Sequence, residues 1–198
     1  MNRLTLIVLS FALVGCQTPP APPPAKPVPL SSVFRLAKLE EIASAIGQAI
    51  DAGKAPGAVV RIESAGAVFQ KSFGDKAIVP ERSPMKTDTI FDAASLTKVI
   101  ATAPAIALLI EQGKLGLDDR VEKWIPDFKK NGKGAVTIRH LLTHTSGLRP
   151  GLSLRPEWSG VASAIEKAKA ELLTEQPDNK FIYSDINFIL LGEIVRLV

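Results

Sequence analysis

Cysteine, aromatic residues and runs of like charge are scarce in this chain of 198 residues. With one cysteine, the chain by itself forms neither an intramolecular disulfide nor a cysteine-built metal site. The formal net charge is only +4, no lysine or arginine run of the kind that follows phosphates is present, and aromatic residues make up 6%, so nucleic-acid binding has little support. What the chain does have is a hydrophobic content of 46%, which is enough for a buried core and typical of one ordinary domain with tails.

The N-terminal residues have the pattern of an export signal. An apolar run at 4–14 is too short for a membrane-spanning helix, which needs about 20 apolar residues, but it suits the hydrophobic region of a signal peptide. The run ends in Leu-Val-Gly-Cys at 13–16, which resembles the lipobox of bacterial lipoproteins. This resemblance implies that residues 1–15 are a signal peptide and that Cys16 becomes lipid-modified and begins the mature chain. The alternative is a plain signal peptide with an incidental cysteine.

The residues after the cysteine indicate where the chain is anchored. Gln17 follows Cys16, and no aspartate of the inner-membrane-retention type is there, so the analogy with lipoproteins implies an outer-membrane anchor that faces the periplasm. Residues 18–30 are dominated by proline, which favours an extended polyproline II conformation. We therefore expect residues 16–31 to be a lipidated cysteine with a stiff tether and residues 32–198 to be the folded part.

The folded part is predicted to begin with a helix and two strands. Apolar residues recur at helical spacing and predict an amphipathic helix over 32–52, with Gly53 as its stop. Residues 58–63 and 68–73 are predicted strands, joined through a turn at 64–66. Because a two-stranded hairpin is not stable by itself, we expect it to pair with further strands or to pack against the flanking helices.

The remaining chain is predicted to be mostly helical after a polar loop, so the fold class is α+β. A helix that starts at Ser95 is interrupted by Pro104, whose missing amide and ring clash cost about 3 kcal/mol in a helix interior, so we expect a kink or a restart near Ala103. Further helices are predicted over 121–128, 137–142, 161–173 and 186–198. The last of these has apolar residues on nearly every side, which is typical of a helix inside a larger body.

Ser95 and Lys98 are a candidate nucleophile and activator at the start of that helix. A residue three positions along lies one turn up on the same face, so the hydroxyl and the amine can come within reach. A serine hydroxyl needs an adjacent base, and a lysine serves only if it is neutral, which burial and the positive end of the helix dipole favour. The Ser95 backbone N–H is also available to an oxyanion. The alternative is that Ser95 only caps the helix, but a stabilising capping box has Glu or Gln, not Lys, three residues after the cap.

Three motifs, in order, carry a resemblance to a known family. They are SLTK at 95–98, RHLLTHTSGL at 139–148 and YSDINFILLG at 183–192. Together they resemble the serine β-lactamase-like family, and within it the group of class C β-lactamases, DD-peptidases and related esterases, over nearly everything from Leu36 to the end. The resemblance implies a β-lactamase/transpeptidase-like fold and a hydrolase that works through an acyl-enzyme. We expect no cofactor.

The resemblance also implies roles for three residues. Ser95 forms the acyl-enzyme, Lys98 activates it, and Tyr183 relays protons and protonates the leaving group. Physical chemistry agrees, because a lysine ammonium stabilises a neighbouring phenolate and lets Tyr183 alternate between base and acid. The alternative for Tyr183 is a half-buried aromatic residue at a helix entrance.

Two departures from the family pattern affect the prediction. The second position after Tyr183 holds Asp185 instead of asparagine, which removes an amide donor, adds a charge at an expected substrate contact, and favours ester or peptide substrates over efficient β-lactam hydrolysis. No Lys-Thr-Gly or His-x-Gly strand follows Tyr183, and in family members that strand supplies the second oxyanion donor. Because the loss of one such donor costs about 2.7–4 kcal/mol of barrier, we expect a C-terminally truncated hydrolase, without its C-terminal strands, that turns over weakly or not at all.

His140 and His144 lie four residues apart and are the remaining candidates for metal ligands. The zincin motif needs a glutamate directly after the first histidine, where this chain has Leu141, and no third ligand is evident. We therefore predict no metal site, and a structural turn that closes over the Ser95 site.

Two functions from different classes stay open. The first is acyl transfer in the periplasm through Ser95, on an ester, a D-alanyl peptide or a β-lactam, with the membrane reached through the lipid anchor at Cys16. The second is a catalytically silent lipoprotein that binds cell-wall peptide or a protein partner. A probe that reacts with an active serine separates them.

Overall fold

A computed structural model describes residues 27–198 of the chain. The predicted signal peptide, the lipidation site at Cys16 and most of the tether lie outside these residues and stay predictions. The chain divides into two compact units between Ile90 and Phe91, and the first unit is described from residue 27 onward. In the part of the chain that the structure describes, no helix combines the length and the apolar character that crossing a bilayer requires.

The first unit has one long helix, α1 (Leu36–Asp51), after a short 3-10 turn, η1 (Leu30–Ser32). α1 confirms the predicted helix, although it begins later than position 32 because the preceding residues form the 3-10 turn. It stops where the sequence predicts. Gly53 has a φ of +69°, the left-handed conformation that glycine adopts without a steric penalty at a helix end. Leu39 is the buried residue of this helix.

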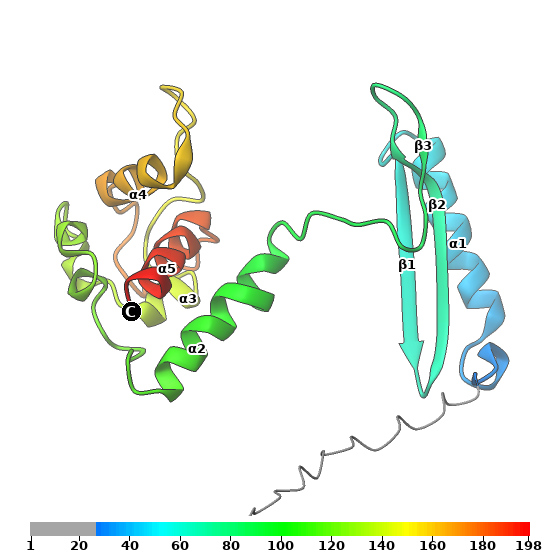
Figure 1. Ribbon diagram of the computed structural model, residues 1–198, viewed down its shortest axis with the longest axis horizontal. Helices are drawn as coiled ribbons and strands as arrows, with labels where there is room; N and C mark the ends of the chain where they lie inside the picture. The colour runs from blue at the N-terminus through cyan, green and yellow to red at the C-terminus, as the bar shows by residue number, and fades with distance from the viewer. Residues whose placement is uncertain (1–26) are drawn as a thin grey trace, which may run out of the picture. The chain divides into compact units, whose positions relative to one another are not determined.

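α1 packs against a three-stranded antiparallel sheet of order β1-β2-β3 (Figure 1). The strands are β1 (Gly57–Ser64), β2 (Ala67–Ala77) and β3 (Ser83–Pro84). β1 and β2 pair in a register that places Gly57 opposite Gly74, and this pairing confirms the predicted hairpin. β3 lies inside the predicted loop and was not expected, because two residues, one of them proline, carry no strand signal.

The second unit is mainly helical. In chain order it contains η2 (Lys98–Thr102), α2 (Ala103–Glu111), η3 (Val121–Lys123), η4 (Pro126–Lys129), η5 (Lys133–Ala135), α3 (Ile138–Leu142), α4 (Gly160–Ala170) and α5 (Asp185–Leu197). The last three predicted helices correspond to α3, α4 and α5. The helix predicted over 121–128 is wrong, because Pro126 divides this stretch into the 3-10 turns η3 and η4.

α5 supplies the largest share of the core of the second unit. It packs against α2, α3, α4 and η2, and Figure 1 shows it among these helices. Its fully buried apolar side chains are Ile186, Leu190, Leu191 and Ile194. They belong to a cluster of fourteen buried residues that also takes in Ile106 of α2 and Leu141 of α3. The prediction that the last helix lies inside a larger body is confirmed.

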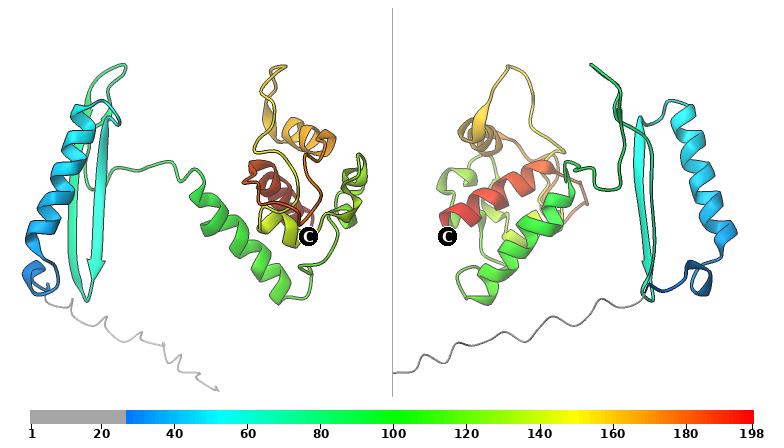
Figure 2. Two further views of the ribbon diagram at one scale, coloured as in Figure 1. Left: turned by 180° about the vertical axis from the view of Figure 1, so that it is seen from behind. Right: turned by 45° about the vertical axis from the view of Figure 1, so that its right-hand side comes forward.

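The helix that follows Ser95 changes type just ahead of Pro104. η2 is a π-helical turn and α2 begins at Ala103, so the predicted restart near Ala103 is confirmed, although the ribbon in Figure 2 continues through it without a gap. A π-helical turn bonds each residue to the one five positions on, as the Ala103 N–H does to the Lys98 carbonyl, and its wider turn makes room for a proline ring. Lys98 is the first residue of this turn, and such turns are frequent at functional sites.

Candidate active site

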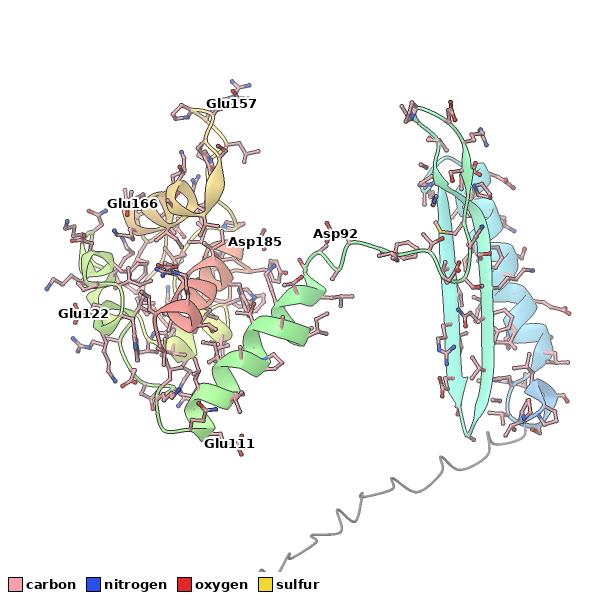
Figure 3. The ribbon with its side chains drawn as sticks, viewed as in Figure 1. Asp92, Glu111, Glu122, Glu157, Glu166 and Asp185 are labelled. Carbon is pink, nitrogen blue, oxygen red and sulfur yellow. The ribbon has the colours of Figure 1, made fainter. Side chains whose placement is uncertain are left out.

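Ser95 follows a strained turn in the second unit, directly before the helical run. Ala94, the residue before it, has a φ of +42°, a left-handed value that is uncommon for any residue other than glycine. Asp92, labelled in Figure 3, holds this turn because its Oδ1 accepts a hydrogen bond of 2.8 Å from the Ala94 N–H. The backbone becomes helical at Leu96, so Ser95 lies exposed at the helix start.

The Ser95 hydroxyl faces Lys98. The amine Nζ donates a hydrogen bond to Ser95 Oγ over 3.3 Å, one turn along the helix, as the three-residue spacing predicts. Within residues 27–198, none of the first helical N–H groups donates a hydrogen bond to this hydroxyl. The alternative in which Ser95 only caps the helix therefore lacks its defining hydrogen bond.

Lys98 is also paired with a carboxylate. Asp185, the first residue of α5 and labelled in Figure 3, places its Oδ1 2.7 Å from Lys98 Nζ. Burial of the Lys98 side chain, which is 14% exposed, works against its charge, but hydrogen bonds and charges from Asp185 and Tyr183 outweigh burial and raise the pKa of Lys98. The carboxylate beside Lys98 therefore favours the ammonium, whereas burial and the helix start favour the neutral amine.

Tyr183 reaches this pair from the segment that precedes α5. The centre of its ring lies 5.1 Å from Lys98 Nζ, and its side chain stays 44% exposed. Hydrogen bonding with the Ser95 hydroxyl, then with Lys98, and the positive charge of Lys98 lower the pKa of the Tyr183 phenol below its ordinary value. A phenolate at this position is thus formed at lower pH than in a free tyrosine.

The groups of these two segments converge on one cleft of about 430 Å³. Ser95, Lys98, Asp185 and Phe188 are among the residues that line it. The Ser95 N–H has no acceptor among the described residues, so it is available to a developing oxyanion. The structure therefore brings together Ser95, Lys98 and Tyr183 as well as Asp185, and the catalytic and substrate-binding roles given to them stay predictions.

A layer of buried polar residues lies next to Tyr183, and the sequence analysis missed most of it. His144 accepts a hydrogen bond of 3.0 Å from the Ser184 N–H, and its ring centre lies 4.5 Å from that of Tyr183. Asn187 and Ser146 are buried beside it. One signal was available: Asn187 is a polar residue on a helix whose neighbouring positions are apolar, and such a residue needs a buried partner.

His140 belongs to a separate network. It completes a capping box at the start of α3, where its Nδ1 accepts a hydrogen bond of 3.0 Å from the Thr137 N–H. Its Nε2 lies 2.9 Å from Asp178 Oδ2. The two histidines of the chain therefore have different partners, and across residues 27–198 no group of three potential metal ligands is present.

Comparison with known proteins adds relatives to this geometry. A family model described as Beta-lactamase matches residues 42–198. The chain is 35% identical to penicillin-binding protein 4* of Bacillus subtilis (strain 168), over 71% of this chain and 32% of that protein. It is 33% identical to a provisionally named D-alanyl-D-alanine carboxypeptidase of Escherichia coli (strain K12), over 99% of this chain and 50% of that protein.

A solved structure is similar as well. The octameric penicillin-binding protein homologue from Pyrococcus abyssi matches with a TM-score of 0.68 and 30% identity, over 83% of this chain and 39% of that one. The predicted fold, α+β and β-lactamase/transpeptidase-like, is confirmed by this likeness, and the described helices and sheet correspond to part of it. The chain spans half or less of the length of the curated relatives that it matches.

Proposed function

This chain belongs to the Beta-lactamase family, a family of serine hydrolases, and from that premise we propose that it forms an acyl-enzyme at Ser95. One observation carries the proposal: Lys98 Nζ lies 3.3 Å from Ser95 Oγ, beside a tyrosine whose pKa both groups lower. A positioned hydroxyl with a phenol and an ammonium at hand is the arrangement that activates a serine nucleophile. The acyl donor is an ester, a D-alanyl peptide or a β-lactam.

The base in this proposal is the Tyr183 phenolate, because the raised pKa of Lys98 keeps that side chain an ammonium. Ser95 Oγ attacks the acyl carbon while its proton passes to the phenolate, and the carbonyl electron pair moves to the oxygen, which accepts a hydrogen bond from the Ser95 N–H. When the tetrahedral species collapses, the bond to the leaving group breaks and Tyr183 returns the proton to that group. The charge of Lys98 stabilises the phenolate form of Tyr183 before each transfer.

In this proposal, Asp185 determines which of the candidate substrates are favoured. Its carboxylate lines the cleft and neutralises the charge of Lys98, so the cleft has no unpaired positive group to attract an anionic acyl donor. The side chain also accepts hydrogen bonds where an asparagine would donate one. Uncharged ester donors are therefore favoured over β-lactams and over D-alanyl peptides that end in a free carboxylate.

The place of action belongs to the same proposal. The apolar run and the Leu-Val-Gly-Cys sequence at 13–16 support lipidation of Cys16, and the proline-rich residues after it suit a tether to the outer membrane on its periplasmic side. Incorporation of a labelled fatty acid into the wild-type chain, and its loss in Cys16→Ser, would support the anchor.

Covalent labelling tests the reaction. A fluorophosphonate and a fluorescent penicillin are each incubated with the wild-type chain and with Ser95→Ala, and the labelled protein is separated under denaturing conditions. We expect a covalent label on the wild type and none on the variant. Labelling reports one acylation event and does not depend on turnover. A chain that folds but takes up neither probe at any dose contradicts the proposal and favours the lipoprotein that only binds cell-wall peptide or a partner.

A further inference from the structure

A buried polar network lies against the Tyr183 segment. Among residues 27–198, five polar or charged residues are buried, and four of them are joined by hydrogen bonds. These four are His144, Ser146, Ser184 and Asn187. Such groups are retained in a protein interior only when their hydrogen bonds are made, so a connected set at one point of the core is a specific construction.

The directions of these hydrogen bonds fix the state of the His144 ring. A backbone N–H only donates, so the 3.0 Å bond from Ser184 N requires a lone pair on His144 Nδ1. The Asn187 amide lies 3.3 Å from the same Nδ1 and donates to it, since its Oδ1 accepts a 2.6 Å bond from the Ser146 hydroxyl. Ser146 Oγ in turn accepts from the Leu148 N–H at 3.1 Å. Every bond is satisfied only if His144 is neutral with its proton on Nε2.

The same ring is packed against aromatic side chains. Its centre lies 4.5 Å from that of Tyr183 and 5.2 Å from that of Phe188, with interplanar angles of 33° and 36°. Phe181 meets it edge-on at 5.8 Å. Tyr183 itself is 44% exposed, and on its covered side the ring of His144 and the bond made by the next residue, Ser184, restrain it.

We propose that His144 is the positioning residue for Tyr183: through its Nδ1 and its ring it holds the phenol beside Ser95 and Lys98. The chemical consequence rests on the proposed function, whereas the placement of the phenol does not. His144 is not among the residues that line the cleft. It acts by keeping Tyr183 where Ser95 and Lys98 lower the pKa of the phenol. The turn at 143–148, predicted to be only structural, thereby gains a role in the site.

The composition of the chain makes this proposal directly measurable, since Tyr183 is the only tyrosine. The ultraviolet absorbance of the phenolate can be followed against pH in the full chain, with Tyr183→Phe as the blank. In the wild type we expect the midpoint below the ordinary phenol value of about 10. In His144→Gly, which suits the left-handed φ of +58° and removes both ring and acceptor, we expect the midpoint to return to about 10.

Two further variants separate placement from general stability. His144→Asn tolerates the same left-handed backbone and keeps an acceptor near the position of Nδ1, so its midpoint should lie between those of the wild type and His144→Gly. His140→Ala is the matched control, because that histidine also accepts a backbone N–H through Nδ1 but contacts neither Tyr183 nor Ser184 among the described residues. Its phenol midpoint should equal that of the wild type.

Several results would overturn the proposal. They are a wild-type midpoint at the ordinary value, an unchanged midpoint in His144→Gly, an equal rise in His140→Ala, or a His144→Asn variant as perturbed as the glycine variant. If His144→Gly does not fold, the nitrogen NMR shifts of the wild-type ring decide. A protonated Nδ1 at neutral pH contradicts the proposal, and a neutral ring with its proton on Nε2 supports it.

Acylation gives a second readout that distinguishes this proposal from the proposed function. A displacement of about 1 Å in a reacting group lowers a rate by as much as about 100-fold, so labelling of Ser95 should fall by about that factor in His144→Gly and recover in part in His144→Asn. The groups that face His144 are Lys98, Asp185 and Tyr183. Burial, then the charge of Lys98, lowers the pKa of His144, and Asp185 opposes this shift. The positioning contact should therefore persist at pH values below the ordinary histidine pKa and fail only at still lower pH.

The two readouts can also disagree. If no label appears but the phenol midpoint still responds to substitution of His144, the acylation reaction is rejected and the positioning contact stands.

Discussion

The two units of the chain differ in how much apolar surface they bury. In residues 27–90 the buried apolar side chains are Leu39, Ala67 and Met85, whereas in residues 91–198 fourteen form one continuous cluster. Hydrophobic burial is the main favourable term in folding, so the second unit is the one with a core that supports a fixed arrangement of side chains. The sheet unit has a helix on one side and little buried volume.

The candidate active site lies entirely in the better packed unit. Ser95 and Lys98 are at the start of the helix that continues as α2, and Tyr183 and Asp185 are at the start of α5. α2 and α5 pack against each other and share the cluster of buried residues. The reacting groups are therefore carried by the ends of helices whose remaining turns are packed in a core. Such packing holds functional groups in precise positions.

The largest effect on stability is expected from a core truncation, and it should differ between the units. Leu190→Ala removes a fully buried side chain from the middle of α5, and such substitutions cost about 2–5 kcal/mol because a cavity remains. Leu39→Ala in α1 should cost about 2 kcal/mol, since a thin layer collapses more easily around the gap. Denaturant unfolding followed by circular dichroism measures both. Leu190→Ala should also slow labelling of Ser95, while Leu39→Ala should leave it unchanged; equal effects of the two variants on labelling would break the comparison.

The next largest effect is expected on the reactivity of the cleft and not on the stability of the fold. Asp185→Asn removes the carboxylate from Lys98 and leaves a positive group in the cleft, so a carboxylate-bearing penicillin should gain on a neutral fluorophosphonate. We expect the ratio of the two labelling rates to change by about 10-fold, equivalent to about 1.4 kcal/mol, and the free energy of unfolding to change by less than about 0.5 kcal/mol. The use of a ratio cancels any change in the nucleophile itself. Glu193→Gln, which alters an α5 carboxylate paired with Arg196, is the control; a ratio that moves in both variants or in neither contradicts the role given to Asp185.

The features that the sequence predicts well involve residues close together in the chain. Helical spacing predicted α1 and α5, alternating apolar strands around a turn predicted the hairpin, and the distance of three residues predicted that Lys98 reaches Ser95. Each of these relations involves neighbours along the chain, and the backbone geometry alone determines it. Tyr183 entered only through the resemblance of three motifs to a family, because no local rule relates it to a serine far away in the chain.

What the sequence did not predict depends on contacts between distant segments. Asp185 lies far from Lys98 in the chain, so the ion pair that raises the pKa of the lysine had no local signal, and the helix dipole alone predicted the opposite charge state. The bond between His144 and Ser184 spans forty residues. A buried asparagine hinted that such a partner exists, but only the packing of α5 against the turn at 143–148 identifies it.

The smallest expected effects come from ion pairs, and they test whether the difference between the units extends beyond apolar packing. Lys38 and Glu41 of α1 form a 2.7 Å ion pair with side chains 58% and 62% exposed, so Lys38→Ala should change the free energy of unfolding by less than about 0.5 kcal/mol.

Arg149 and Glu171 form an ion pair in the second unit, and their side chains are 37% and 17% exposed. In Glu171→Gln the half-buried guanidinium of Arg149 keeps only an uncharged, weaker acceptor. We expect the free energy of unfolding to fall by about 1 kcal/mol, because charge-assisted hydrogen bonds are stronger than neutral ones. Urea unfolding at low and at high salt measures both, and only the Lys38 variant should lose its small effect as salt screens the exposed pair. If the two losses are equal, the electrostatics of the two units are alike, and the whole difference between them lies in the fourteen-residue cluster.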